Sequence, residues 1–127
     1  MKTDIQLMSE QKKLTDLSFL RNLTGGQTDK MVKYLRMFLT GAPQSITQME
    51  LHALSKDWVA VKQTAHSLKP QLGYFGAKGS EDLMKQIELQ ADSQTETDRL
   101  PDMIQNFRKQ YEIINAELQE ELNQLTA

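Results

Sequence analysis

Apolar residues recur every three or four positions over most of the chain and are separated by short polar stretches. This spacing places them on one face of a helix, whereas the alternation typical of strands is not sustained anywhere. The pattern therefore predicts an all-α fold. The predicted helices carry Leu17, Leu20 and Leu23; Met31, Tyr34, Leu35, Phe38, Ala42, Ile46, Met49 and Ala53; Trp58, Val61, Ala65, Leu68 and Leu72; Leu83, Met84, Ile87 and Ala91; and Ile104, Phe107, Tyr111, Ile114, Leu118, Leu122 and Leu125.

Capping residues, glycine and proline mark the ends of these helices. Thr15 or Asp16 can cap the first short helix, and Gly25-Gly26 ends it because glycine accepts left-handed backbone angles. Asp57 is a candidate N-cap for the third helix. Pro43 falls inside the second apolar stripe, so it should kink that helix or divide it.

The short connections between these helices favour antiparallel packing of neighbours. We therefore predict an all-α domain over residues 15–127, folded as an up-down antiparallel four-helix bundle with a short N-terminal helix that covers one end. Residues 1–14 are predicted to be flexible. A chain of 127 residues is long enough to bury a core without disulfides or metal.

Composition and charge exclude several classes of protein. The chain has no cysteine, which excludes a disulfide framework, a zinc–cysteine site and thiol catalysis, and which fits a reducing compartment. Its 15 basic and 17 acidic residues form no basic block, so nucleic-acid binding has little support. There is no signal-peptide core and no apolar run of membrane-spanning length. We expect a cytoplasmic protein that binds neither nucleic acid nor membrane. We also expect a monomer, because nothing in the sequence requires a second copy of the chain.

One histidine on the third predicted helix has the features of a reactive group. Histidine carries two usable ring nitrogens, and its unperturbed pKa lies near neutrality. At about 100° per residue, His66 lies roughly 140° from the centre of the apolar stripe and should face solvent. Lys69 can stabilise a phosphoryl group or another anion on the imidazole. The helical neighbours of His66 form a surface suited to a partner: Val59, Lys62, Gln63, Lys69, Pro70 and Gly73.

Pro70 bears on the shape of the helix around this histidine. Its nitrogen stands where an N–H would bond to the carbonyl of His66, and it disfavours helical dihedrals at Lys69. Proline here either ends the helix or bends it. Because the apolar stripe resumes at Leu72 and Phe75, we predict a bend and a freed carbonyl.

The histidine motif reads Ala65-His66-x-Leu68-Lys69, with Gly76-Ala77 ten residues beyond the histidine and Ile87-Glu88 further on. This motif resembles the histidine-containing phosphotransfer (HPt) domain family. The resemblance covers roughly residues 15–90, and the final helix matches in pattern only. Its upstream part rests on Asp16-Leu17-Ser18-Phe19-Leu20 through Gly25-Gly26, on Tyr34, Phe38 and Pro43, and on Ala53-Leu54-x-x-Asp57-Trp58.

The resemblance implies a phosphorelay carrier in two-component signal transduction, which takes a phosphoryl group from one receiver-domain aspartate and passes it to another. His66 would be the nucleophile, reacting through Nε2 to become phosphohistidine. Lys69 would help to neutralise the phosphoryl oxygens, and Glu88 would accept the Nδ1 proton and orient the ring. The expected partners are response-regulator receiver domains and a hybrid sensor histidine kinase. Mg²⁺ would belong to the receiver domain, so no cofactor is expected on this chain.

Two positions depart from the pattern of the family. Pro70 stands where the family commonly has glycine, although some members carry proline there. Ser80 stands where the family often has leucine, and Gly79 precedes it. The second departure predicts a weak start for the fourth helix.

Two other functions compete with phosphotransfer. A binding-only helical module would keep the fold and the docking surface without transferring phosphoryl groups. A metal-dependent bundle enzyme would need Glu-x-x-His pairs on facing helices. The chain has none, and its only other histidine, His52, is expected to be a solvated residue near a helix end. A histidine kinase is disfavoured because there is no glycine-rich nucleotide-binding segment.

Overall fold

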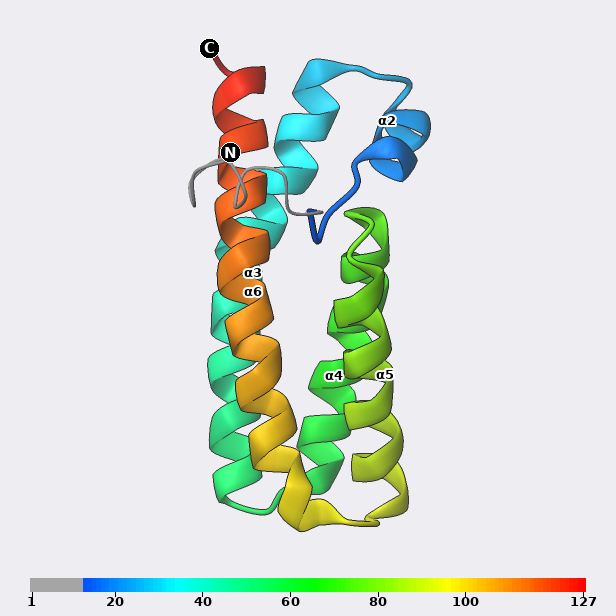
Figure 1. Cartoon of the computed structure of the whole chain (residues 1–127), viewed down its shortest axis with the longest axis vertical. Helices are drawn as coiled ribbons and strands as arrows, with labels where there is room; N and C mark the ends of the chain where they lie inside the picture. The colour runs from blue at the N-terminus through cyan, green and yellow to red at the C-terminus, as the bar shows by residue number, and fades with distance from the viewer. Residues whose placement is uncertain (1–12) are drawn as a thin grey trace, which may run out of the picture.

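The structure is a computed structural model that describes residues 13–127. Every regular element within these residues is helical, which confirms the predicted all-α class (Figure 1). The segment 1–14, predicted to be flexible, lies outside the described residues except for Lys13 and Leu14. The elements are α2 (Ser18–Thr24), α3 (Thr28–Leu54), α4 (Trp58–Tyr74), α5 (Lys78–Ser93), the 3₁₀ turn η1 (Thr97–Arg99) and α6 (Leu100–Leu125).

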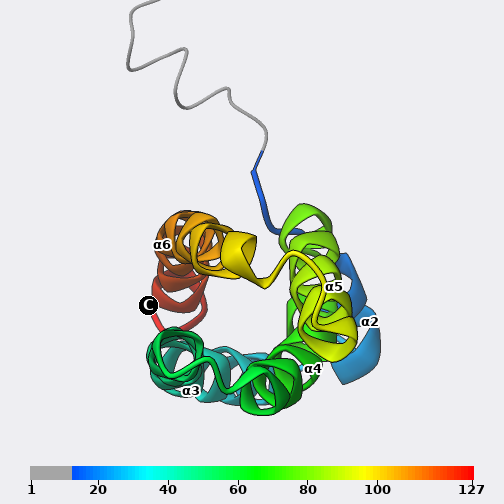
Figure 2. The same cartoon turned by 90° about the horizontal axis from the view of Figure 1, so that it is seen from below.

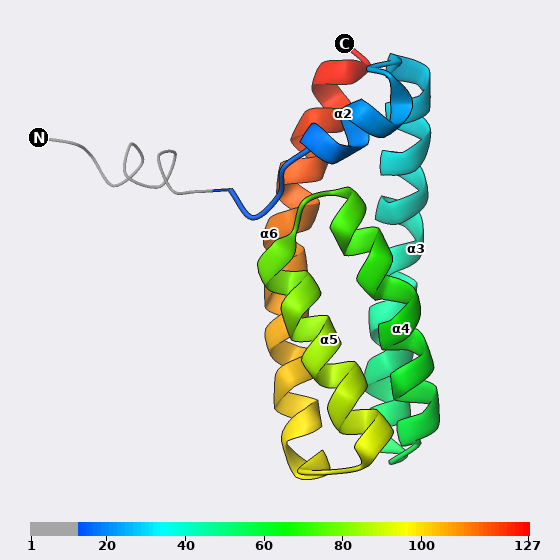
Figure 3. The same ribbon diagram turned by 90° about the vertical axis from the view of Figure 1, so that its right-hand side faces the viewer.

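Helices α3 to α6 lie side by side around one core, with α4 against α3 and α5, and α6 against α3 and α5 (Figure 2). The connections from α3 to α4 and from α5 to α6 lie at one end of the bundle, whereas the connection from α4 to α5 lies toward the other end, partway along the longer α3 and α6 (Figure 1). The short helix α2 packs on α3 and lies beyond the connection between α4 and α5 (Figure 3). The sides of α4 and α5 that face away from the core are exposed to solvent, for example at His66 and Leu89.

The predicted apolar stripes supply most of the core. Residues such as Ile46, Leu72 and Phe107 are fully buried. Leu23 and Tyr34 differ from the prediction, because their side chains are 49% and 36% exposed. Each belongs to a helix whose buried face is already formed by its neighbours, so these two side chains point outward.

The first helix begins later than predicted. Leu17, rather than Thr15 or Asp16, occupies the N-cap position of α2. Asp16 still stabilises this turn, because its Oδ1 accepts hydrogen bonds from the backbone N–H of Ser18 at 2.9 Å and from its hydroxyl at 2.6 Å. Gly25 ends the helix in a left-handed conformation, as predicted.

Both internal prolines lie within continuous helices. Pro43 does not divide α3, and Pro70 does not end α4. Buried residues on both sides of each proline, such as Ala42 and Ile46 around Pro43, hold the two halves of the helix on the same core. This packing offsets the missing backbone hydrogen bond.

Side-chain hydrogen bonds connect α6 to its two neighbours. The predicted weak start of α5 contains Ser80, which is buried and donates from Oγ to Oε1 of Gln110 on α6 at 2.6 Å. This bond stabilises the first turn of α5, where Gly79 and Ser80 have low intrinsic helix propensity. On the other side, Arg108 of α6 donates to both carboxylate oxygens of Glu50 on α3, at 2.7 and 2.6 Å.

Candidate functional site

Helix α4 carries His66, and its two faces determine where that residue points. Asp57 caps the helix as predicted, because its side chain accepts a hydrogen bond from the backbone N–H of Ala60 at 3.2 Å. The buried residues of α4 pack on the core and fix the rotation of the helix about its axis; they are Val61, Ala65, Leu68 and Leu72. The His66 side chain is therefore 71% exposed, which confirms the prediction that it faces solvent.

The helix continues through the turn that contains Pro70 and ends at Tyr74. Leu72 is buried, as the resumption of the apolar stripe predicted. Proline has no N–H, so it leaves the carbonyl of His66 without its usual backbone donor. The bend predicted at this point stays a prediction.

Glu88 of α5 joins the imidazole and the lysine. Its Oε1 lies 2.7 Å from Nδ1 of His66, and its Oε2 accepts a hydrogen bond from the Lys69 ammonium at 2.8 Å. The Glu88 side chain is only 14% exposed, because it lies between α4 and α5 beside the buried Ile87. One carboxylate thus fixes both the ring and the cation.

The charge on this carboxylate decides the tautomer of the imidazole. Hydrogen bonding from Lys69 lowers the pKa of Glu88 below its usual value; burial opposes this effect, and the contact with His66 adds to it. Glu88 is therefore ionised at neutral pH and can only accept hydrogen bonds. Nδ1 of His66 must donate, so Nε2 of the neutral ring carries the lone pair and is the nitrogen free to react.

A second ion pair lies one helical turn away. The ammonium of Lys62 is 2.8 Å from Oδ1 of Asp92 on α5, with side chains that are 43% and 57% exposed. The hydrogen bond to Asp92 raises the pKa of Lys62 above its usual value. Lys62 thus lies on the predicted face of α4, but its ammonium is directed toward α5 by the contact with Asp92.

The other residues predicted to contact a partner occupy different environments. Val59, Gln63 and Pro70 are exposed on the face of α4 that carries His66. Gly73 is half-buried, and a Cβ at this position would lie 2.9 Å from Oε2 of Glu81. Its small size makes room for a side chain of α5. The contact of these residues with a partner stays a prediction.

An exposed aromatic cluster lies at the end of α4 and was missed in the sequence. Tyr74, one residue after Gly73, stacks on Phe19 of α2 with 5.9 Å between ring centroids, and the ring of Tyr34 is 6.2 Å from it. At about 100° per residue, Tyr74 lies about 80° from His66 around the helix. This angle could have indicated that Tyr74 belongs to the surface predicted around His66. No periodicity could have placed Phe19 there, because α2 reaches Tyr74 only through the fold.

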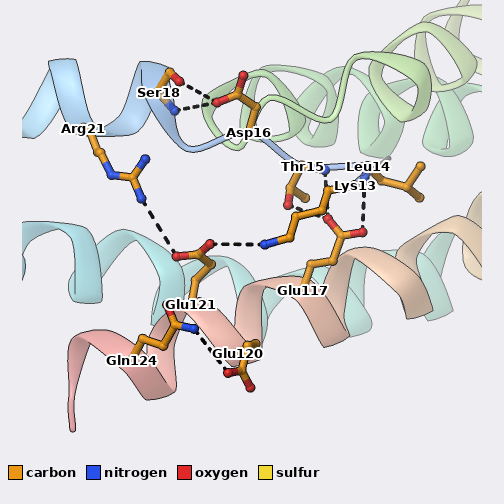
Figure 4. Close-up of polar contacts among 10 residues, drawn as sticks. All are labelled: Lys13, Leu14, Thr15, Asp16, Ser18, Arg21, Glu117, Glu120, Glu121 and Gln124. Carbon is orange, nitrogen blue, oxygen red and sulfur yellow. Dashed lines mark hydrogen bonds and ion pairs between the residues drawn. The ribbon is translucent and has the colours of Figure 1, made fainter. Parts of the chain in front are cut away.

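The segment before α2 is fixed at both of its ends. Glu117 of α6 accepts hydrogen bonds from the backbone N–H groups of Leu14 and Thr15, at 3.0 and 2.9 Å, and from the Thr15 hydroxyl at 2.6 Å (Figure 4). On the opposite side, the backbone N–H of Asp16 donates to the carbonyl of Phe75 at 2.9 Å. This segment therefore bridges α6 and the connection between α4 and α5, and it holds α2 beside Tyr74.

The glycine of the Gly76-Ala77 motif makes that crossing possible. Gly76 has a φ of +64°, and a Cβ on it would run into the backbone of Asp16. Both its conformation and its lack of a side chain are required. The spacing of this glycine from His66 thus reflects the packing of the segment before α2 on the turn that follows α4.

Residues 13–127 lack two other kinds of functional feature. No group of three or more His, Cys, Asp or Glu side chains is close enough together to hold a metal ion. None of the helices in this range is long and apolar enough to cross a membrane.

Comparison with known proteins identifies one family. The family described as Hpt domain matches residues 33–127, from the first part of α3 to the end of the chain. No curated protein and no solved structure gives a significant match. The match begins later than the resemblance noted over residues 15–90, and it also includes the final helix. It covers most of the chain and contains His66, Lys69 and Glu88. The chain therefore belongs to the Hpt domain family.

Proposed function

We propose that this chain is a phosphocarrier, in which His66 accepts a phosphoryl group from a receiver-domain aspartate and passes it to another. Hpt domains take part in two-component phosphorelays, where they interact with receiver domains and kinases. The observation that carries the proposal is the bridging of Glu88, which lies 2.7 Å from Nδ1 of His66 and 2.8 Å from the Lys69 ammonium. This bridge leaves an exposed nucleophilic nitrogen beside a fixed cation.

The proposed transfer follows from the tautomer of His66. The lone pair on Nε2 attacks phosphorus, a nitrogen–phosphorus bond forms, and the bond from phosphorus to the receiver carboxylate breaks. The receiver carboxylate leaves as an anion. The proton stays on Nδ1, so the positive charge that develops on the ring lies beside the carboxylate of Glu88. Positioning and electrostatics supply the catalysis, as is expected for phosphoryl transfer.

Lys69 supplies charge on the phosphoryl side of the site. Its ammonium is anchored at 2.8 Å from Glu88 while its side chain stays 30% exposed, so it can also meet an incoming anion. A phosphoryl group carries close to two negative charges at neutral pH. We propose that Lys69 neutralises part of this charge on Nε2, while Mg²⁺ is held by the receiver domain.

The proposed docking surface for the receiver domain surrounds His66. It comprises the predicted residues Val59, Lys62, Gln63, Pro70 and Gly73 on α4. It extends over Tyr74 and Phe19, which are 36% and 52% exposed. Exposed aromatic residues beside a reactive group favour a protein partner, because they bury large apolar area on contact. We propose response-regulator receiver domains and a hybrid sensor histidine kinase as partners of a monomeric, up-down antiparallel four-helix bundle.

Phosphoryl transfer from purified receiver domains tests this function. Phosphorylated receivers from the source organism, mixed with the chain in the presence of Mg²⁺, are expected to pass on a label that is acid-labile and alkali-stable. That label should then move to a second, unphosphorylated receiver. If a receiver binds the chain but no label is transferred, the binding-only alternative replaces the proposal.

We expect Glu88 to accelerate this transfer because it orients the ring of His66 and holds the ammonium of Lys69. Glu88→Gln retains an acceptor for Nδ1 but loses the charge that pairs with Lys69 and with the imidazolium. We expect the initial rate of transfer to fall by about 3- to 30-fold, which corresponds to the difference between a charge-assisted and a neutral hydrogen bond. The rate is measured by single-turnover transfer from a phosphorylated receiver.

The control for Glu88→Gln is Asp82→Asn on the same helix. Asp82 is an exposed carboxylate outside the site, so the transfer rate of this variant should equal that of the unaltered chain. Nitrogen-15 NMR of the ring provides a second readout, because loss of the carboxylate should reduce the fraction of the tautomer protonated at Nδ1. An unchanged rate and an unchanged tautomer in Glu88→Gln would contradict the role assigned to this carboxylate.

A further inference from the structure

A row of side chains on α5 accompanies the face of α4 that carries His66. Glu81, Glu88 and Asp92 are spaced seven and four residues apart, which places them on one face of α5. Each lies against a residue of α4: Glu81 against Gly73, Glu88 against Lys69 and His66, and Asp92 against Lys62. Carboxylates therefore line the α5 side of the face that carries His66.

Both lysines on the face of His66 are paired with these carboxylates. Lys69 follows His66 by three residues and bonds to Glu88 at 2.8 Å; Lys62 precedes it by four and bonds to Asp92 at 2.8 Å. Side chains three and four residues apart are neighbours on a helix surface. Lys62 is therefore within the same surface patch as Nε2, but its ammonium is directed to α5.

The Lys62–Asp92 pair differs from the pair that Glu88 forms with Lys69. Glu88 is largely buried, whereas the side chains of Lys62 and Asp92 are 43% and 57% exposed. Exposed ion pairs contribute little to folding stability. Glu88 shares its charge between the Lys69 ammonium and the ring of His66, whereas among the described residues Asp92 pairs with Lys62 alone. The Lys62–Asp92 pair therefore presents a dipole rather than a full positive charge to a nearby anion.

We propose that Asp92 is a positioning residue that holds Lys62 on α5 and thereby limits the positive charge available to a phosphoryl group on His66. The proposal rests on the proposed phosphocarrier function. A carrier must release the phosphoryl group as well as accept it, and each additional cation near the phosphohistidine stabilises the carrier state. Asp92 keeps one of the two neighbouring lysines from doing so, and the phosphoryl group remains transferable.

The variant Asp92→Asn tests this role, because it keeps the size of the side chain and removes its charge. Phosphohistidine can be formed without a partner by treating the chain with phosphoramidate, whose phosphorus–nitrogen bond breaks to release ammonia. Phosphorus-31 NMR then reports the titration of the phosphoryl group. In Asp92→Asn we expect the titration midpoint to move to lower pH, because a released Lys62 stabilises the dianion. The phosphoryl equilibrium with a receiver domain should shift toward His66 by about two- to fourfold at low ionic strength.

Two further variants distinguish an effect that acts through Lys62 from a direct effect of the charge on Asp92. Asp92→Asn is repeated in a Lys62→Gln background, where the shift in both readouts should be at most half as large. Asp82→Asn changes an exposed carboxylate elsewhere on α5 and should leave both readouts unaltered. An equal effect of Asp92→Asn with and without Lys62, or no effect at all, would overturn the proposal.

The same experiment distinguishes this inference from the function on which it rests. A His66→Gln sample identifies any signal that arises from His52. If the unaltered chain acquires no phosphohistidine at His66 from phosphoramidate or from a receiver, the proposed function fails and this inference fails with it. If the unaltered chain is phosphorylated and transfers normally while Asp92→Asn behaves identically, only the role of Asp92 is overturned.

Discussion

His66→Gln is expected to abolish covalent phosphorylation of the chain by a phosphorylated receiver domain. Glutamine has no nucleophilic ring nitrogen, so no stable phosphoryl product can form at this position. Its side-chain amide can still donate a hydrogen bond to Glu88. The measurement is acid-labile label on the chain after incubation with a phosphorylated receiver and Mg²⁺, and the expected level is that of a reaction without the chain.

The loss of label should not come from unfolding. The His66 side chain is 71% exposed, and surface substitutions of this kind usually change the free energy of unfolding by less than about 0.5 kcal/mol. Helical circular dichroism and the urea midpoint of His66→Gln should therefore match those of the unaltered chain. His52→Gln is the matched control, because His52 is the only other histidine, and it should be labelled normally. Equal labelling of His66→Gln and the unaltered chain would refute His66 as the acceptor.

Gly76→Ala is expected to destabilise the fold by about 2 to 4 kcal/mol, since a strained left-handed conformation and a steric clash add together. Gly76 has a φ of +64°, and a Cβ would meet the backbone of Asp16. Relief of the clash would separate the segment before α2 from the α4–α5 turn and weaken the bond from the Asp16 N–H to the carbonyl of Phe75, now 2.9 Å long. The urea midpoint measures the loss.

Gly79→Ala, in the same region, is not expected to destabilise the fold. Gly79 is the second residue of α5, and no atom within 4 Å would obstruct a Cβ there. Alanine is favoured over glycine by about 0.5 to 1 kcal/mol in the middle of a helix and by less in its first turn, so this variant should unfold at an equal or slightly higher urea concentration. If Gly76→Ala were as stable as the unaltered chain, the close packing of Asp16 on Gly76 would be contradicted.

The stability of Gly76→Ala also bears on the proposed docking surface. The segment that crosses Gly76 leads into α2, which holds Phe19 on Tyr74. A variant that loses this crossing should therefore bind receiver domains more weakly. His66 itself, whose helix is packed independently on α3 and α5, should still react with phosphoramidate.

The sequence predicted the features that depend on one helix at a time. The three- and four-residue spacing of apolar positions identified the helices and placed His66 on the outward face of α4. The cap at Asp57 followed from residue type alone. These features are set by backbone geometry and by short-range hydrogen bonds, so neighbouring residues in the chain contain the information.

The sequence was less informative wherever two helices meet. The sequence did not indicate that Lys62 bonds to Asp92 or that Gly73 makes room for Glu81. The contact of both residues with a partner stays a prediction. Ser80 was expected to weaken the start of α5, yet it is satisfied by Gln110 of α6. Periodicity gives the direction of a side chain around its own helix, but not the height at which a neighbouring helix presents its partner.

The amino-acid sequence by itself therefore determined an all-α chain with an exposed histidine and a lysine on the same helical face. Only the tertiary structure decided which carboxylates meet them: Glu88 on the ring and on Lys69, and Asp92 on Lys62. It also decided that α2 reaches Tyr74. The physical reason is that these contacts depend on the axial register and rotation of packed helices, which are set by how all the buried side chains fit together.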